Sequence, residues 1–157
     1  MRFAIVRALF NGNITARLLE GAQRGFADAR VPARNIHVFE VPGSFELPLA
    51  ALWLAQSRKY DAIVCLGCII KGETPHFYYV AARTADGIAE VGLRTGVPVI
   101  FGVLTTENVR QALDRAAAVR VGRSDHNKKK QRTNKGYEAA QSGVSMVQLR
   151  KKTRGRA

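Results

Sequence analysis

The chain has 157 residues, of which 46% are apolar and 24% are charged; this fits one domain with a packed core and excludes a wholly disordered chain. No segment approaches the roughly 18 consecutive apolar residues of a transmembrane helix, and the first residues lack the apolar stretch of a signal peptide. The net charge of +13 would favour a nucleic-acid binder if it were spread evenly over the chain.

Short apolar segments alternate with helical patterns in the first half of the chain. We expect strands at 3–8 and 36–41. A helix capped by Asn13 follows the first strand, and a helix over 45–57 follows the second, with Pro48 tolerated only in its first turn. The first helix carries apolar residues at helical spacing: Ile14, Leu18, Ala22, Phe26 and Ala29.

The second half continues the same alternation. We expect strands at 61–66 and 97–103, and helices at 74–94, from Thr105 or Thr106 to about 118, and at 135–151. Gly96 is a typical stop signal for the long helix. Strands that alternate with helices predict a three-layer α/β/α sandwich with a four-stranded parallel sheet. In such sheets, ligands bind beyond the carboxyl ends of the strands.

Two cysteines are present, Cys65 in a predicted strand and Cys68 in the turn expected after it. This excludes a disulfide framework and favours a reduced, cytoplasmic compartment. No second cysteine pair and no suitably spaced histidine accompany them, so we expect no metal site.

The positive charge is concentrated in two segments. Residues 120–135 and 150–156 carry +6 and +5 of the +13, so the remainder carries only +2. We therefore expect a single domain over 1–157, with a basic insertion at about 120–133 and a basic tail at 150–157. Such segments are usually solvated. Neither contains an aromatic residue for stacking on bases, so nucleic-acid binding is not expected.

Aromatic and titratable residues lie at or just after the ends of the predicted strands, with Phe101 just before the end of the fourth. Phe10, Phe45 and Phe101 either stack on a flat heterocycle or pack in the core. Glu46 either pairs with ring N–H groups of a ligand or complements the dipole of its helix. Four strand ends with such residues predict a shared pocket.

The segment after the third strand combines a glycine turn with a histidine. The expected helix start at Gly72-Glu73-Thr74 suits a phosphate, yet it is neither a Walker loop nor a dinucleotide fingerprint. His76 follows this turn, and its imidazole is suited to proton transfer near neutral pH. A purely structural role in the helix is the alternative.

Several of these motifs together resemble the lumazine synthase family of riboflavin biosynthesis. They are Phe10-Asn11, Val-Pro-Gly-Ser-Phe-Glu at 41–46, Gly-Cys-Ile-Ile-Lys-Gly-Glu-Thr-Pro-His-Phe at 67–77, Pro-Val-Ile-Phe-Gly-Val-Leu-Thr-Thr-Glu-Asn at 98–108 and Asn134-Lys135-Gly136. The resemblance extends from about Phe3 to Leu149. It implies a flavodoxin-like fold and a transferase that needs no cofactor. The implied reaction condenses 5-amino-6-(D-ribitylamino)uracil with 3,4-dihydroxy-2-butanone 4-phosphate to 6,7-dimethyl-8-ribityllumazine, phosphate and water.

The resemblance also implies which residues bind the pyrimidine substrate. Phe10 and Phe45 would flank the ring, while Ser44 and Glu46 would form hydrogen bonds with the ring or the ribityl chain. Three consecutive residues would line the same site: Cys68, Ile69 and Ile70.

The second substrate and the chemistry involve another set of residues by the same resemblance. Glu73 and Thr74 would bind the phosphorylated ketone, and His76 would transfer protons. Phe101 and Arg115 match positions that the family supplies from a neighbouring subunit, with Arg115 on the phosphate.

The chain also departs from the family pattern. Leu9 stands where an arginine is usual, Tyr78 replaces an acidic residue, and the segment before Asn134 is longer. Because a basic insertion would obstruct and repel neighbouring pentamers, we expect a homopentamer in preference to an icosahedral cage; an association with riboflavin synthase is compatible with the family. The alternative is a weakly active or inactive relative that binds polyanions or serves as a structural assembly protein.

Overall fold

The computed structural model describes residues 1–118 and 134–155, and the basic insertion predicted at 120–133 lies outside these ranges. The described chain contains one parallel sheet in the order β2-β1-β3-β4. Its strands are β1 (Phe3–Ala8), β2 (Ile36–Val41), β3 (Ala62–Ile70) and β4 (Val99–Thr106). The strand order puts β1 and β3 in the centre and leaves β2 and β4 at the edges.

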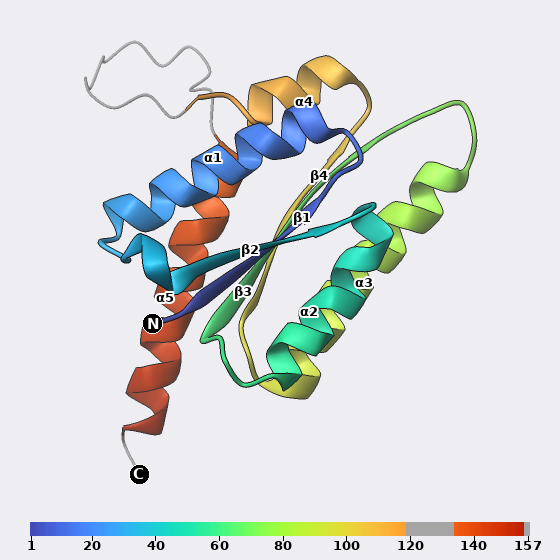
Figure 1. Ribbon diagram of the computed structural model, residues 1–157. Coiled ribbons are helices and arrows are strands. Elements are labelled where there is room, and N and C mark those ends of the chain that lie inside the picture. The colour runs from blue at the N-terminus through green and yellow to red at the C-terminus, as the bar shows by residue number, and fades with distance from the viewer. Residues whose placement is uncertain (119–133, 156–157) are drawn as a thin grey trace.

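Helices cover both faces of the sheet (Figure 1). They are α1 (Gly12–Asp28), α2 (Leu47–Gln56), α3 (His76–Thr95), α4 (Val109–Arg115) and α5 (Lys135–Arg154), with short 3-10 helices η1 (Ala33–Asn35) and η2 (Ser44–Glu46). Helices α1, α4 and α5 lie on one face and α2 and α3 on the other. The three-layer, flavodoxin-like architecture is confirmed. Within the described ranges, no helix is long and apolar enough to cross a membrane.

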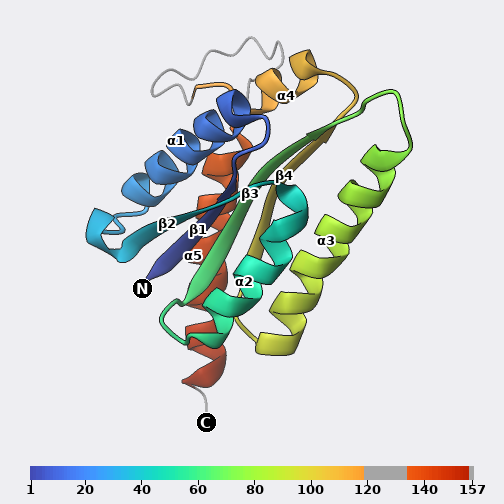
Figure 2. The same cartoon turned by 45° about the vertical axis from the view of Figure 1, so that its right-hand side comes forward.

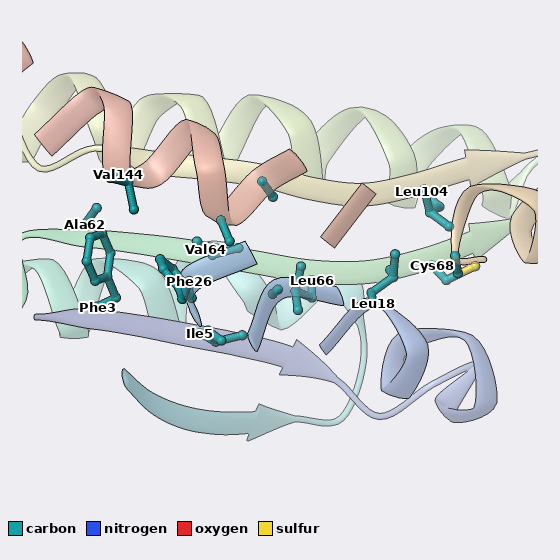
Figure 3. Packing of buried hydrophobic residues seen from close by; sticks show 14 of the residues in the cluster. Phe3, Ile5, Leu18, Phe26, Ala62, Val64, Leu66, Cys68, Leu104 and Val144 are labelled. Carbon is teal, nitrogen blue, oxygen red and sulfur yellow. The ribbon is translucent and has the colours of Figure 1, made fainter. Parts of the chain in front are cut away.

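The central strands are apolar throughout because each face contributes to a separate core. In β1, Phe3 and Ile5 pack toward α1 and α5, whereas Ala4 and Val6 pack toward α2 and α3. Figure 3 shows Phe3 beside Phe26 of α1 in the first of these cores, where the ring centroids are 4.6 Å apart. These two cores hold the sheet rigid beneath the loops that follow its strands.

Two strands are longer than the sequence predicted. Strand β3 continues to Ile70 and β4 to Thr106, because the two strands remain paired up to Ile70 and its partner Thr106. Cys68 therefore lies within β3, and its predicted position in a turn is wrong. The predicted cap of α4 at Thr105 or Thr106 is also wrong, since the side chain of Asn108 accepts the capping hydrogen bond from Gln111 N at 3.0 Å.

Three other helix ends differ from the prediction. Asn11, not Asn13, precedes α1; it adopts a left-handed conformation with φ 56°, and its carbonyl accepts from Ile14 N. Helix α3 begins at His76 and not at Thr74, because the residue before Pro75 is disfavoured in the helical conformation. Helix α4 ends at Arg115, since the next residue forms a β-bridge with Asn134.

Other predicted signals are confirmed. Pro48 lies in the first turn of α2, although that helix begins at Leu47 and is preceded by η2. Gly96 ends α3 with φ 64°, a conformation that glycine adopts without strain. Helix α5 starts where expected but continues to Arg154.

Candidate active site

The loops that follow β1, β2 and β3 meet at the carboxyl edge of the sheet (Figures 1 and 2). Phe10 follows β1, residues 44–46 form η2 after β2, residues 68–70 end β3, and His76 begins α3. The expected pyrimidine-binding residues and the expected proton-transfer residue are thus at one edge, since all the strands are parallel.

All three predicted aromatic residues are exposed, and two of them lie at this edge of the sheet. Phe10 is 70% exposed and Phe45 is 58% exposed, so neither packs in the core. Large apolar side chains that are exposed on neighbouring loops are typical of a binding site. Their positions favour the ligand-stacking interpretation of Phe10 and Phe45 over the core-packing one.

Arg7, a residue not predicted to have a role, fixes the loop that carries Phe10. From the end of β1 its guanidinium donates hydrogen bonds to Gly12 O (3.1 Å), Thr15 Oγ1 (3.2 Å) and Glu40 Oε1 (3.2 Å). It thereby connects the first turns of α1 to β2. The detectable signal was an arginine inside an otherwise apolar strand, a position where a charge needs partners.

Backbone contacts complete the support of this loop. Leu9 N and Phe10 N donate to Val41 O and Pro42 O at 2.8 and 3.0 Å, which extends the pairing of β1 with β2 past the strand ends. The Asn11 side chain donates to Cys68 O at 2.9 Å. The loop is therefore hydrogen-bonded to β3 and to the end of β2, and these contacts fix the backbone that carries the Phe10 ring.

Ser44 and Glu46 are held by their own local contacts. Glu46 Oε2 accepts a hydrogen bond from Gly43 N at 2.9 Å, which closes the turn before α2. Ser44 is buried, and its carbonyl accepts from the Thr84 hydroxyl of α3 at 3.2 Å. A Cβ at Gly67 would lie 2.6 Å from Ser44 Oγ, so only glycine fits beneath this serine.

The segment between β3 and α3 is exposed and is anchored at its first residue. Lys71 N donates to Thr106 O at 2.9 Å, and Lys71 Nζ pairs with Glu107 at 3.0 Å and lies 5.7 Å from the ring centre of Tyr78. Hydrogen bonds with Glu107 and then Tyr78 raise the pKa of Lys71. Glu73, Thr74 and His76 are all exposed on this segment or at the start of α3.

The remaining residues of β3 are buried. Ile69 is buried and Ile70 is half-buried, while Cys65 and Cys68 are buried free thiols. Burial raises the pKa of Cys65 to about 12 and that of Cys68 to about 11. Both thiols are therefore neutral at physiological pH and cannot act as nucleophiles.

Phe101 and Arg115 belong to a second group of residues. They line a cavity of about 390 Å³ along the edge strand β4, together with Lys135 and Glu138 of α5. Arg115 donates to Gln111 O at 3.0 Å, and Lys135 Nζ pairs with Glu138 at 2.6 Å. Lys135 belongs to the motif Asn134-Lys135-Gly136, but no local sequence signal predicted a role for Lys135 or Glu138.

The described chain does not bring the two groups into one cavity. The cavity beside β4 contains none of the residues from the loops after β1, β2 and β3. Residues 1–118 and 134–155 also contain no cluster of three or more histidine, cysteine or acidic side chains placed to hold a metal ion.

Comparison with known proteins identifies the family of the chain. The family model described as 6,7-dimethyl-8-ribityllumazine synthase matches residues 1–151. A protein of that name from Syntrophus aciditrophicus is 44% identical over 149 residues, covering 95% of this chain and 89% of the relative. One from Campylobacter hominis is 46% identical over 150 residues, covering 96% and 88%. The chain therefore belongs to the 6,7-dimethyl-8-ribityllumazine synthase family, transferases of riboflavin biosynthesis.

Proposed function

We propose that this enzyme condenses 5-amino-6-(D-ribitylamino)uracil with 3,4-dihydroxy-2-butanone 4-phosphate and releases 6,7-dimethyl-8-ribityllumazine, phosphate and water. The observation that carries the proposal is the pair of exposed rings, Phe10 and Phe45, at the carboxyl edge of the sheet in a chain of this family. A flat, polar heterocycle is the kind of ligand that two such rings accept by stacking.

The pyrimidine substrate binds in this proposal between Phe10 and Phe45. Ser44 and the second carboxylate oxygen of Glu46 hydrogen-bond the ring or the ribityl chain, since Glu46 Oε2 is already bonded to Gly43 N. The end of β3 at Cys68, Ile69 and Ile70 forms the floor of the site. Because backbone hydrogen bonds already hold the loops that carry Phe10 and Phe45, these loops lose little conformational entropy when the pyrimidine binds.

The phosphorylated ketone binds beside it, near Glu73 and Thr74. Its phosphate is bound by Arg115, with Lys135 as a second cation, and Phe101 closes the site from the same side. These three residues line one cavity, which supports their acting together. Since that cavity excludes the loops with His76, Arg115 of a neighbouring subunit completes each site.

His76 transfers protons in two steps of the reaction. The amine of the pyrimidine attacks the ketone carbonyl, and the resulting carbinol needs a proton on its oxygen to leave as water. Elimination of phosphate then removes a proton from carbon while Arg115 balances the charge of the leaving group. Attack of the ribitylamino nitrogen on the remaining carbonyl, with loss of a second water, closes the lumazine ring. An exposed imidazole at the edge of the site can donate the first proton and accept the second; such help is worth about 10²–10⁴-fold. Holding the two substrates together supplies much of the remaining acceleration.

We also propose assembly into a homopentamer, as the family resemblance implies, because a ring would place each β4 cavity beside the loops of the next subunit. We further propose that the protein functions in the cytoplasm, where its free thiols stay reduced. An association with riboflavin synthase, which would use the lumazine product, is compatible with this role.

The direct test mixes the purified protein with both substrates and follows the absorbance and fluorescence of the lumazine. Formation of the lumazine at a rate well above that of the mixture without protein supports the proposal. No acceleration would favour the second candidate, an inactive relative that serves in assembly or binds polyanions; the basic segments are the observation behind it.

A further inference from the structure

A second cavity, of about 610 Å³, lies at the opposite end of the sheet from the proposed active site. It is formed where the turns before β3 and β4 meet the last part of α5 (Figures 1 and 2). Its size is within the range of small-molecule sites. The residues that line it are Ala55, Gln56, Arg58, Tyr60, Asp61, Arg94, Thr95, Val97 and Arg150.

Three arginines from three separate elements line this cavity. Arg58 comes from the turn after α2, Arg94 from the last turn of α3, and Arg150 from α5, where it is the first residue of the basic tail. Cations brought together from distant parts of a chain repel one another unless an anion lies between them. The proposed lumazine chemistry uses none of these arginines.

Two of the three guanidinium groups have no partner in the described chain. Arg94 pairs with Glu90 at 2.5 Å. The side chains of Arg58 and Arg150 form no hydrogen bond or ion pair with residues 1–118 or 134–155, although Arg150 is half-buried. Their five N–H donors each are therefore available to a ligand.

The one carboxylate in the lining does not neutralise these arginines. Asp61 Oδ2 accepts from the backbone N–H of Arg2 at 2.7 Å and lies 3.8 Å from the amino terminus. Ala55, Tyr60 and Val97 also line the cavity and supply apolar surface, and the Tyr60 hydroxyl lies 2.9 Å from His37 Nδ1. The cavity thus combines two unpaired cations with an apolar wall.

We propose that this cavity binds a phosphate monoester or a similar dianion. Two unpaired guanidinium groups match the charge of one phosphate dianion, and their planar geometry suits two-point contacts with phosphate oxygens. The rest of the ligand lies along Ala55, Tyr60 and Val97. This gives the start of the basic tail a role that the proposed reaction leaves unexplained.

The test measures binding of phenyl phosphate, a phosphate monoester that is a dianion at mildly alkaline pH, by calorimetry at low salt. It uses the Arg115→Ala background, so that the arginine proposed to bind phosphate in the active site does not contribute. The double variant Arg58→Gln with Arg150→Gln removes the two unpaired cations. Lys59→Gln with Lys152→Gln is the matched control, because it removes the same charge from neighbouring positions outside the cavity lining. Thermal unfolding followed by circular dichroism shows that each variant is folded, and Arg150→Gln alone replaces the double variant if that one does not fold.

The expected result is one site per subunit whose affinity falls at least tenfold in the arginine variant and less than threefold in the lysine variant. Equal losses in the two variants would mean attraction by net charge alone and would overturn the proposal. Absence of binding in the parent protein would overturn it as well. Because the readout is binding and not turnover, the result does not depend on the proposed reaction. Lumazine formation in the arginine variant with Arg115 intact is expected to remain unchanged.

Discussion

At the level of single residues, the site depends on side chains whose positions are fixed by neighbours distant in sequence. Arg7 connects β1 with β2 and α1, and Asn11 reaches the carbonyl of Cys68, so the exposed Phe10 ring is carried by a rigid loop. His76, in contrast, is exposed at the first position of α3. Because the His76 side chain is exposed, we expect that it can be replaced without unfolding the protein.

Replacing His76 therefore tests chemistry separately from stability. We expect His76→Ala to slow lumazine formation by roughly one to three orders of magnitude, because acid–base help is lost while substrate proximity remains. The melting temperature should stay the same. His37→Ala is the control, since His37 is also exposed but lies in β2 and contacts Tyr60. A turnover number in His76→Ala equal to that of the parent would contradict the role.

The two thiols give a prediction about pH. Burial raises the pKa values of Cys65 and Cys68 to about 12 and about 11, above the value of 9.0 for a free thiol. The contribution of the two neutral thiols to the free energy of unfolding is therefore fully present below pH 9.0. It is lost as the pH rises toward 11 and 12, because the thiols ionise at lower pH in the unfolded chain than in the folded one.

The measurement is the free energy of unfolding in urea at several pH values. We expect a decline above pH 9.0 that is smaller in Cys65→Ala with Cys68→Ala than in the parent chain. At pH 8 the native thiols should not react with a thiol reagent such as iodoacetamide, whereas the unfolded chain should react at both. Rapid labelling of the native protein at pH 8 would show that the thiols are not buried.

At the level of secondary-structure elements, β3 connects the core to the site. Its residues from Ile63 to Ile70 pair with β4, and Gly67 leaves space for Ser44 at the start of η2. The close contact between a strand and the η2 turn explains why the position of Ser44 depends on an element far along the chain.

Adding one methyl group to β3 should disturb this contact. In Gly67→Ala the new Cβ would meet Ser44 Oγ at 2.6 Å and Leu47 Cδ1 at 3.1 Å. We expect a loss of about 1–3 kcal/mol in unfolding free energy, together with a higher KM for the pyrimidine and a smaller change for the ketone.

Gly143→Ala is the matched control for this substitution. A Cβ there meets no atom closer than 3.6 Å, and the residue lies within α5. Alanine should therefore stabilise the helix by up to about 1 kcal/mol and leave both KM values unchanged. Equal effects at the two glycines would show that steric space beneath Ser44 does not matter.

At the level of the whole molecule, the proposed site requires two copies of the chain. The cavity with Phe101 and Arg115 borders an edge strand, and Phe101 is 44% exposed, so the described chain leaves this half of the site uncovered. An assembly that joins the two halves would cover these surfaces.

Mixed assemblies test whether the site is shared. We expect Arg115→Ala and His76→Ala subunits to be poorly active separately and to regain part of the parent activity when they assemble together, because some interfaces then combine an intact Arg115 with an intact His76. Co-refolded mixtures and a measurement of turnover per subunit check this. No recovery in assemblies shown by mass to contain both variants would contradict a shared site.

The size of the assembly is a separate prediction. We expect a species of five subunits by native mass spectrometry and light scattering at moderate salt, because basic segments at contacts between pentamers would repel, although salt screens this repulsion beyond about 10 Å at 0.1 M. A species of sixty subunits would contradict the prediction.

The sequence by itself determined the strand and helix order, the parallel sheet and the motifs of the family. The reason is that burial on both faces produces uniformly apolar strands, and that the family motifs are continuous segments at or after the strand ends. Local signals did not predict that β3 extends to Ile70 or that Asn11 precedes α1, since pairing with β4 and hydrogen bonding to Cys68 are contacts between distant segments. Tertiary structure also decided that Arg7 supports Phe10 and that Lys135 joins Phe101 and Arg115 in one cavity. These residues act through neighbours that only folding brings within hydrogen-bonding or packing distance.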